Sequence, residues 1–559
     1  MKKIVVALSV LFLLVSFGKV SHAEPLIPSD QANVTIDINK TYQTIEGFGA
    51  SYTWYSDWLP GVNERETGYD WIFNDAEFNI LRFRDQHGVK GDEKNVPLEG
   101  YKPYKAYYDA AVARGITPIV LVTSWGQYDR ELPFVAFTEK SEKGYSYYTL
   151  AKDENGEYMY DELAEFCVQS IQYFLDAGIP VHYFSISNEI ELQELHKDEQ
   201  GNARNDAGFF FGMEENEDHC AYWKAHLAVY EAFQKAFGEK APSIIGAETM
   251  AGSSDYLKGY LEPLLKERPE TFDVVAHHLY GTTLTAENFA NIYNDFSDYR
   301  LWQTEWYCNE YIKLGDVILN ELISENITAF LYWNGVWIED DGNCLIEIST
   351  WEPGAEIKRM PGHYIMMHFS KFIKSGYQRV DVAEDLRSKV GAFVSPDGSR
   401  MVVVVSNNYY KAEELTLGLN REITGSQVYR STGSKETYME DIGEYEEGMK
   451  MPAMTLTTIV LELGDEIERK TEEAQPIESE AQETDSEVQD TEAQDNQSKA
   501  QDTESEAQDA ESETQVAEVT ASKMADWNGN IMVVVGIVLA VVFATALLVT
   551  VLLRRRKNK

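Results

Sequence analysis

Two glutamates in this chain end short apolar runs that are typical of buried β-strands. Glu189 ends the run Phe184-Ser-Ile-Ser-Asn-Glu, and Glu305 ends the run Leu301-Trp-Gln-Thr-Glu. Two carboxyl groups that face each other across a site can hydrolyse a glycosidic bond. One must hold a proton for the leaving oxygen, and the other must stay ionised to attack the sugar carbon. Glu189 and Glu305 are therefore the candidate catalytic residues.

Polar and aromatic residues near the same runs fit such a site. The amide of Asn188 can hydrogen-bond a sugar hydroxyl, and aromatic rings suit the CH-rich faces of sugars. The candidate aromatic residues are Trp54, Tyr55, Trp125, Tyr280, Trp306, Tyr307, Trp333 and Trp337. Ordinary packing is the competing interpretation for each aromatic ring, and a salt bridge is the competing interpretation for each glutamate.

The elements that must position these residues alternate between strand and helix. Helix-like segments lie at 104–114, 160–177 and 219–237, and each is followed by a glycine, a common helix stop signal. We predict eight strands: Ile45–Ala50, Ile80–Arg84, Thr117–Thr123, His182–Ser187, Ser243–Ala247, Asp273–His278, Arg300–Thr304 and Thr328–Trp333. This order predicts an α/β fold, a (β/α)₈ TIM barrel, whose chemistry lies at the C-terminal ends of the strands. Glu189 and Glu305 would then lie at the ends of the fourth and seventh strands.

The chain changes character after the predicted barrel. The runs Val390–Val394, Met401–Val405 and Leu456–Leu461, with turn residues between them, are typical of antiparallel sheet. Residues Asn33–Asn39 alternate in the same way and can join that sheet. We therefore predict an attached antiparallel β-sandwich whose strands come from both ends of the chain.

The two ends of the chain carry signals for export and anchoring. Lys2 and Lys3, an apolar run and Ser21-His-Ala23 describe a secretory signal peptide. The uncharged run Ile531–Leu553, followed by four basic residues, predicts a transmembrane helix with the preceding chain outside the cell. The predicted organisation is a signal peptide (1–23), an N-terminal strand segment (24–44), a barrel (45–375), a β-sandwich (376–464), a disordered acidic linker (465–526), a transmembrane helix (531–553) and a cytoplasmic tail (554–559).

Composition narrows the range of partners. The chain carries 93 acidic against 48 basic residues, a formal charge of −45, so nucleic acid is not an expected partner. The four cysteines Cys167, Cys220, Cys308 and Cys344 form no CxxC pair, which argues against a zinc site, and their disulfide pairing stays open. We assign no metal and no cofactor.

Taken in order, the motifs resemble glycoside hydrolase family 30, a family of (β/α)₈ retaining glycosidases. The distinctive pieces are Gly47-Phe-Gly-Ala50 and His368-Phe-Ser-Lys-Phe-Ile373. The matching pieces between them are Leu81-Arg82, Ser187-Asn-Glu189, His278-Leu-Tyr-Gly281, Thr304-Glu305, Tyr332-Trp333 and Gly362-His-Tyr364. The resemblance covers about two-thirds of the chain.

The resemblance implies a role for each site residue. Glu189 would be the general acid/base, Glu305 the nucleophile, and Arg82 the support that keeps the nucleophile charged. Arg84 competes with Arg82 for this role, because side chains two residues apart on a strand face the same side. The residues expected to bind substrate are Asn188, Trp125, His278, Tyr280, Trp333 and Trp54. Because His277 precedes His278 directly, one of the two histidines must face away from the barrel interior.

The family includes glucosylceramidases, xylanases, β-xylosidases and β-1,6-glucanases. Glucuronoxylanase-type members grip an acidic branch with a basic residue after the eighth strand, whereas here that loop begins Gly335-Val-Trp-Ile-Glu-Asp-Asp341. Basic residues follow only at Lys358 and Arg359. The sequence therefore favours a cell-surface enzyme that cuts xylan or a similar neutral β-linked glycan. The alternatives are an exo-acting glycosidase, glucosylceramidase- or xylosidase-like, and a surface protein that binds glycans without cutting them.

Overall fold

The computed structural model describes residues 32–466, apart from Ser56 and the segments 86–97, 126–131, 139–146, 192–195, 198–202, 205–207 and 339–342. The predicted signal peptide, the acidic linker after Glu466 and the apolar run Ile531–Leu553 lie outside the described residues. Within the described ranges, no helix combines the length and the apolar character that a membrane crossing requires. The chain divides into two compact units, Met1–Thr471 and Glu472–Lys559, and all described residues belong to the first.

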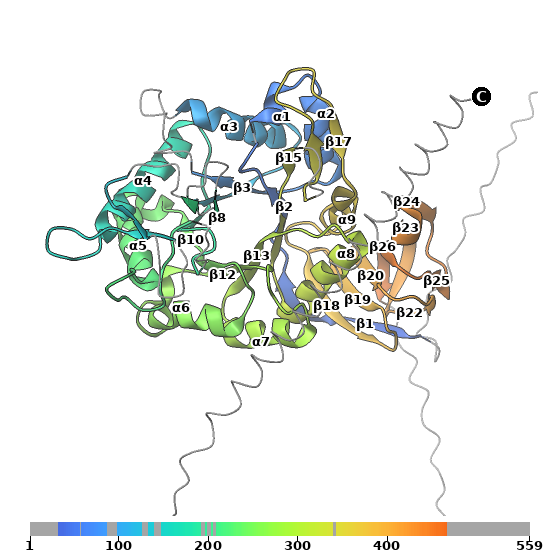
Figure 1. Ribbon diagram of the computed structural model, residues 1–559. Coiled ribbons are helices and arrows are strands. Elements are labelled where there is room, and N and C mark those ends of the chain that lie inside the picture. Colours follow the sequence, from blue (N-terminus) through green and yellow to red (C-terminus); the bar gives the residue numbers. More distant parts are fainter. Residues whose placement is uncertain are drawn as a thin grey trace, which may run out of the picture. The chain divides into compact units, whose positions relative to one another are not determined.

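A ring of parallel strands forms the centre of this unit (Figure 1). In spatial order the strands are β10 (Ser243–Ile244), β7 (Tyr183–Ser185), β4 (Ile119–Thr123), β3 (Ile80–Arg84), β2 (Gly47–Ser51), β14 (Ala329–Tyr332), β13 (Arg300–Trp306), β12 (Val274–His278) and β11 (Gly246–Thr249). The two end strands are consecutive in sequence, with only Ile245 between them, and β10 pairs with β7 while β11 pairs with β12. The ring is therefore closed, and its eight strand positions are the eight that the sequence predicts.

Small apolar residues and one tryptophan fill the ring. The interior cluster contains Ile80, Leu121, Ile245, Val274, Ala276, Trp302, Ala329 and Leu331, all nearly inaccessible to solvent. Alternate residues of each strand point inward in a closed parallel barrel, so this cluster shows which residues of β3, β4, β12, β13 and β14 face the interior. The residues between them, such as Val275 and Leu301, belong to the larger cluster under the helices.

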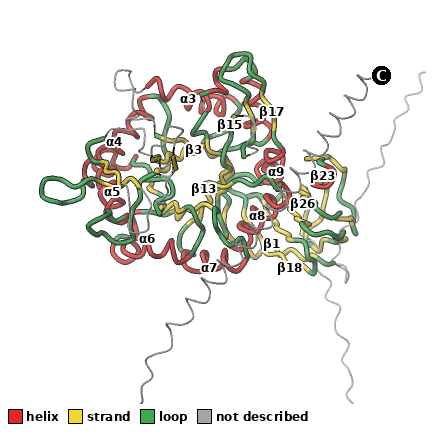
Figure 2. The backbone as a smooth tube through the Cα atoms, in the orientation of Figure 1, coloured by secondary structure: helices red, strands yellow, loops and turns green. Residues whose placement is uncertain are grey.

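Helices surround the strands and cover their outer faces (Figure 2). They are α1 (Trp58–Gly61), α2 (Arg65–Asp70), α3 (Leu98–Ala113), α4 (Tyr160–Asp176), α5 (Tyr222–Phe237), α6 (Ser254–Glu267), α7 (Ala286–Phe296), α8 (Tyr311–Asn320) and α9 (Pro361–Ser370). The turns η1 (Trp71–Asp75) and η4 (Glu321–Glu325) extend α2 and α8. Gly115, Gly178 and Gly238, predicted as stop signals, follow α3, α4 and α5 closely and have positive φ angles.

The Gly-Phe-Gly-Ala motif lies at the start of the ring, in β2. A Cβ atom on Gly49 would lie 1.9 Å from the backbone oxygen of Ile80 on the neighbouring strand β3. Any larger residue would push these two strands apart, so the motif has a packing reason independent of catalysis.

An eight-stranded sheet built from both ends of the chain packs beside the barrel (Figure 1). Its order is β22 (Leu417–Gly418), β1 (Val34–Thr44), β18 (Gln378–Glu384), β19 (Lys389–Val394), β20 (Arg400–Asn407), β26 (Thr455–Glu466), β23 (Arg421–Thr432) and β24 (Thr437–Gly443). Strand β1 pairs antiparallel with β18, so the N-terminal segment joins this sheet as predicted. Strand β26 continues to Glu466, two residues into the segment predicted to be linker.

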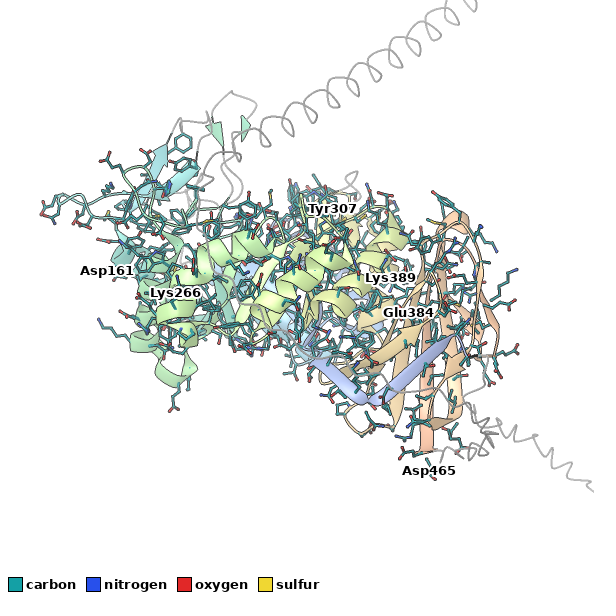
Figure 3. All side chains as sticks on the ribbon, turned by 90° about the horizontal axis from the view of Figure 1, so that it is seen from below. Asp161, Lys266, Tyr307, Glu384, Lys389 and Asp465 are labelled. Carbon is teal, nitrogen blue, oxygen red and sulfur yellow. The ribbon has the colours of Figure 1, made fainter. Side chains whose placement is uncertain are left out.

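The side sheet has two buried faces. Val403 and Ile459 belong to the sheet's own core, whereas Val402 and Val404 belong to the barrel cluster. At this boundary Lys389 on β19 forms a 2.7 Å ion pair with Asp316 on α8 (Figure 3). The buried ring of His368 on α9 lies within hydrogen-bond distance of Thr458 and Ser431 on the sheet, which gives His368-Phe-Ser-Lys-Phe-Ile373 a structural role.

The remaining described elements are short. They are β5 (Val135–Thr138) with β6 (Tyr147–Leu150), β8 (His196–Lys197) with β9 (Ala203–Arg204), β15 (Val336–Ile338) with β16 (Ile346–Ile348) and β17 (Ile357–Arg359), β21 (Glu413–Leu415) with β25 (Met449–Met451), and the turns η2 (Gly238–Lys240), η3 (Pro269–Thr271) and η5 (Gly433–Lys435).

Candidate active site

The two predicted catalytic carboxylates meet at the C-terminal end of the barrel. Glu305 lies on β13, and Glu189 lies four residues after β7 in a left-handed conformation with φ of 50°. Nδ1 of His278 lies 3.1 Å from Oε1 of Glu189 and 3.9 Å from Oε1 of Glu305. One oxygen from each carboxylate and one ring nitrogen of His278 lie within 4.8 Å of one another. The barrel therefore brings the two glutamates to one point.

Arg82 is the cation beneath this pair. Its buried guanidinium donates to Oε2 of Glu305 at 2.6 Å and to Oδ1 of Asn188 at 2.7 Å. It also donates to the hydroxyls of Ser51 and Thr123, at 3.0 and 3.1 Å. A planar group with several fixed N–H donors suits this set of acceptors. Arg82 therefore fixes the orientation of Glu305.

The competing arginine has different contacts. The guanidinium of Arg84 lies 3.8 Å from the ring centroid of Trp54, whereas that of Arg82 lies 4.5 Å from the ring of Trp125. Of these two arginines, Arg82 alone is recorded in an ion pair with Glu305 among the described residues.

A third carboxylate belongs to the site and was missed from sequence. Glu248 on β11 is fully buried, and its Oε1 lies 3.1 Å from Nη2 of Arg82. Its Oε1 is also 3.7 Å from Nε2 of His278. The fifth strand was predicted to end at Ala247, two residues before the observed end at Thr249, so Glu248 was not considered among acidic residues at strand ends. A glutamate directly after a predicted barrel strand was the available signal.

The charges of these groups influence one another. Although burial opposes it, Arg82 and His278 lower the pKa of Glu248 to about 2. Burial alone would lower the pKa of His278, but the negative charges of Glu305, Glu189 and Glu248 raise it to about 9. Burial raises the pKa of Glu305, and His278 and Arg82 oppose that shift. At neutral pH, therefore, His278 and Arg82 are cations and Glu248 is an anion.

The two adjacent histidines point to opposite sides of β12. His278 pairs with Glu305 in the register of β12 and β13 and faces the site, as predicted for the substrate-binding histidine. His277 pairs with Gln303 on the outer side, and its Nε2 contacts Glu325.

Most of the predicted aromatic residues gather around the carboxylates. Trp125 stacks on Trp333 with centroids 5.5 Å apart and meets Trp54 edge-on at 6.2 Å. Tyr280 lies against His278 and Tyr307, and Tyr307 is partly exposed (Figure 3). The other ring contacts join Trp337 to Trp333 and to Tyr55. Trp306 is the exception, because it is buried in the cluster under the helices and is not a rim residue.

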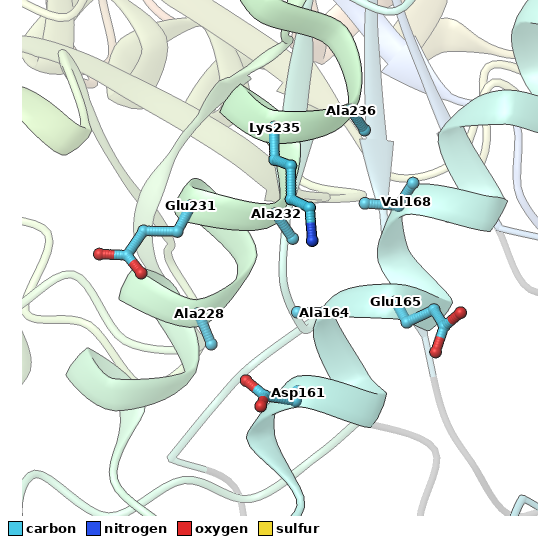
Figure 4. A pocket seen from close by; sticks show the side chains of 9 residues that line it. All are labelled: Asp161, Ala164, Glu165, Val168, Ala228, Glu231, Ala232, Lys235 and Ala236. Carbon is cyan, nitrogen blue, oxygen red and sulfur yellow. The ribbon is translucent and has the colours of Figure 1, made fainter.

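A hollow elsewhere on the barrel contains none of these residues (Figure 4). It has a volume of about 640 Å³ and lies between α4 and α5. Its lining residues are Asp161, Ala164, Glu165, Val168, Ala228, Glu231, Ala232, Lys235 and Ala236. They include no nucleophile beside a base and lie on the outer helices, away from the strand ends where barrel chemistry occurs. We therefore place the site at the carboxylate pair.

Comparison with known proteins places this geometry in context. No protein-family model matches the chain. The curated protein glucuronoxylanase XynC of Bacillus subtilis (strain 168) is 24% identical over 245 residues, 40% of this chain and 54% of that protein. The chain thus spans about half the length of the curated relative it matches.

Solved structures match over a larger part of the chain. A GH30 endoxylanase from Clostridium papyrosolvens C71 has a TM-score of 0.57 at 22% identity, covering 77% of this chain and 100% of that one. A conserved exported protein from Bacteroides fragilis has a TM-score of 0.60 at 17% identity, covering 76% and 99%. At these identities the structural matches establish the fold, a (β/α)₈ barrel with a side sheet. Together with the curated match, they support the resemblance to glycoside hydrolase family 30 that the motifs indicate.

Proposed function

We propose that this chain is a retaining glycoside hydrolase that cleaves xylan or another neutral β-linked glycan. The observation that carries the proposal is the approach of Glu189 and Glu305 to within 4.8 Å, oxygen to oxygen. Retaining glycosidases hold their carboxyl groups about 5–5.5 Å apart, whereas inverting enzymes need about 6.5–9.5 Å to admit a water molecule. The short gap supports direct attack on the sugar by a carboxylate.

The charges around the pair support the presence of one proton on it. The contacting groups include two cations, Arg82 and His278, and three carboxyl groups, Glu189, Glu248 and Glu305. Because Glu248 is ionised, the cluster is neutral when one of the other two carboxyl groups is protonated. Arg82 donates to Glu305 at 2.6 Å and favours its ionised form, which supports Glu305 as the nucleophile and leaves the role of proton donor to Glu189.

The reaction then follows double displacement. Protonated Glu189 donates to the leaving oxygen while ionised Glu305 attacks the anomeric carbon, and the glycosidic bond breaks as the covalent glycosyl–enzyme bond forms. Glu189, now ionised, removes a proton from water, and the hydroxyl group displaces Glu305. Asn188, held by Arg82, is available to bind a sugar hydroxyl, and Trp54, Trp125, Trp333, Tyr280 and His278 supply the walls.

The substrate proposal follows the relatives with one departure. The names of the relatives include a glucuronoxylanase and an endoxylanase, which supports a xylan-like glycan. In this chain, however, Lys358 pairs with Glu347 at 3.1 Å and Arg359 with Asp75 at 2.7 Å. Residues 339–342 of the preceding loop lie outside the described residues. Because both basic residues are paired and the chain is strongly acidic, we propose a neutral main chain as the target.

The proposed location is the outer face of the cell membrane. It rests on the signal-peptide pattern of residues 1–23 and on the apolar run Ile531–Leu553 with its basic flank. The relative named as an exported protein is consistent with export.

The test is to follow hydrolysis by the purified full chain. Unsubstituted xylan, glucuronoxylan and other β-glycans are supplied, the anomeric configuration of the first product is read by NMR, and product lengths are measured. We expect retained configuration and cleavage that does not require glucuronic acid branches. An inverted product rejects the double displacement, and no new reducing ends from any β-glycan rejects the enzyme.

A variant of the proposed acid tests the assignment of roles. Glu189→Gln should slow cleavage of glycans, which have poor leaving groups, by about 10²–10⁴-fold. Aryl glycosides with activated leaving groups should lose much less in the first step, because they leave without a proton. Equal losses on both substrates contradict the role of Glu189.

A further inference from the structure

A second buried cluster lies behind the active site, on the outer face of the same strand. Ala276 and Trp302 point into the barrel interior, so their neighbours His277 and Gln303 point outward towards the helices. The helical turn η4 covers them, because Nε2 of His277 lies 2.6 Å from Oε1 of Glu325. Glu321 and Glu325 are four residues apart and share one face of η4.

The cluster has the composition of a cation site. His277, Glu321 and Glu325 each offer one ligand atom, and these atoms lie within 4.8 Å of one another. All three side chains have 0% exposure. Imidazole nitrogen and carboxylate oxygen are the donors that divalent transition-metal ions such as Zn²⁺ accept from proteins.

The oxygens of Glu321 point to a missing partner. Among the described residues, neither carboxyl oxygen of Glu321 has a hydrogen-bond partner, and Oε2 of Glu325 has none either. The side-chain amide of Gln303, which the register places beside His277, is also buried and without a hydrogen-bond partner in the described chain. Buried polar atoms are almost always satisfied, so this many in one place require a ligand or a proton.

Electrostatics gives the same requirement. Glu321 and Glu325 are both fully buried, and one carboxyl oxygen of each lies within 4.8 Å of the other. No arginine or lysine is recorded in an ion pair with Glu321 or Glu325 in the described part of the chain, unlike the Arg82 contact of Glu305. Two carboxylates in a closed apolar site must therefore be neutralised by added positive charge.

The ring of His277 is oriented so that Nε2 can bind a metal ion. Its Nδ1 lies 2.9 Å from the backbone oxygen of His278. Because a carbonyl oxygen only accepts hydrogen bonds, Nδ1 carries the proton and donates it. Nε2, which faces Glu325, can then present its lone pair to a metal, and this backbone bond is the usual support of a metal-binding histidine.

We infer that His277, Glu321 and Glu325 bind one divalent transition-metal ion, such as Zn²⁺, between the outer face of β12 and the turn η4. Two carboxylates and one dication sum to zero charge, which suits complete burial. The side-chain carbonyl oxygen of Gln303 is the uncharged candidate for the fourth ligand of the metal ion. It would complete the four ligands of a closed structural site. Ligand atoms at about 2.1 Å from an ion lie roughly 3.0–3.4 Å apart, so the His277–Glu325 contact must open by less than 1 Å.

The site differs from a catalytic metal centre in its closure. A catalytic metal keeps a position open to water, whereas this cluster is fully buried behind the barrel wall. The ion would fasten η4 to β12, the strand that also carries His278. The inference does not depend on the proposed hydrolysis, because its ligands are not residues of the active site.

The experiment uses the purified full chain and measures metal directly. After dialysis against metal-free buffer, bound metal is measured by mass spectrometry, and Zn²⁺, Mn²⁺ and Co²⁺ are titrated while the melting temperature is recorded. We expect one equivalent of metal per chain, visible Co²⁺ absorption bands, and a melting temperature that falls by a few degrees on adding chelator. Glu321→Gln should weaken Zn²⁺ binding by at least about 100-fold.

Two controls keep the result interpretable. Glu287→Gln removes an exposed carboxylate from the first turn of α7 and should bind metal as the wild type does. In chelator, Glu321→Gln should melt no lower than the wild type, because an amide removes the carboxylate repulsion. A wild type that binds no metal and shows no thermal shift overturns the inference. Binding that survives in Glu321→Gln also overturns it, and metal content is scored separately from hydrolysis.

Discussion

Two neighbouring histidines on β12 each face a group of glutamates, but the two clusters are built differently. On the inner side, His278 meets Glu189 and Glu305 beside Arg82 and Glu248, and the first two glutamates keep 9% and 5% of their surface exposed. On the outer side, His277 meets Glu325 and Glu321 with 0% exposure. Histidine and glutamate therefore lie together in two electrostatic settings a few ångströms apart along one strand.

The two clusters differ in counter-charge and in access. Arg82 donates to Glu305 in the inner pair, whose two glutamates keep some exposed surface, and the proposed hydrolysis needs both features. The outer pair has neither, so its negative charge must be cancelled by a proton or an ion, and it can hold structure together but cannot meet a glycan. The residue types alone do not distinguish the two clusters. A neighbouring positive charge and the access of substrate to the carboxylates do distinguish them.

The largest expected effect is the loss of activity when one carboxylate of the inner pair is replaced. Glu305→Gln should reduce kcat/KM on every glycan and aryl glycoside by at least about 10³-fold, because the covalent step loses its nucleophile. The metal content of this variant should equal that of the wild type, since the outer cluster is untouched. Steady-state kinetics and metal analysis of the same preparation check both statements. Substantial turnover, or loss of metal, would break the proposed division between the two clusters.

A smaller effect on activity is expected from substitution of Arg82, the cation that the inner cluster has and the outer cluster lacks. Arg82→Lys cannot reach Glu305, Asn188 and Glu248 together, so it should lower kcat/KM and reduce the free energy of unfolding by about 3 kcal/mol. Arg84→Lys is the matched control, and loss of its stacking on Trp54 should cost only about 0.5–1 kcal/mol. Urea unfolding and kinetics of both variants decide between them. Equal effects of the two substitutions would contradict the assignment of Arg82, and not Arg84, as the arginine that supports Glu305.

The smallest effect is the pH dependence of the free energy of unfolding. The inner cluster should lower this free energy both at acid pH and at alkaline pH. The folded pKa of Glu248, about 2, lies below its ordinary value of 4.5, so its contribution to stability is present above pH 4.5 and is lost towards pH 2. The folded pKa of His278, about 9, lies above its ordinary value of 6.5, so its contribution is present below pH 6.5 and is lost towards pH 9. Each shift corresponds to about 3 kcal/mol at most.

Chemical unfolding across this pH range checks the assignment at fixed metal concentration. Glu248→Gln should flatten the acid side of the stability profile. The alkaline side should largely remain, because Glu305 and Glu189 still face His278. An acid side that is unchanged in Glu248→Gln would mean that Glu248 is not ionised in the folded protein.

Much of the fold could be predicted because it depends on local pattern. Apolar runs of strand length and glycines after helices located the eight strand positions and the N-terminal strand of the side sheet. Boundaries were less certain, and ending the fifth strand at Ala247 concealed Glu248, whose charge is paired with an arginine three strand positions away around the ring. Trp306 was predicted at the rim, but it packs under the helices instead.

The outer cluster was beyond the reach of sequence pattern. One of the two adjacent histidines had to face outward, but which one depends on the register of β12 and on the bulge between Gln303 and Glu305 on β13. Glu321 and Glu325 resemble ordinary surface glutamates of a helix until the barrel is closed against them. The proposed ligands come from two separate elements and form no sequence motif. Sequence pattern therefore could not indicate this cluster, and no metal was assigned from the sequence.

The pairing of β1 with β18 imposes an order of assembly. Val34 lies opposite Glu384, so the strand that emerges first from the ribosome must wait for residues made some 350 positions later. Closing so long a loop is slow, and until then β1 is an open edge able to pair with other chains. A chain truncated before Gln378 would lack β18 and leave that edge of β1 unpaired, so the side sheet can form only once its C-terminal strands have been made.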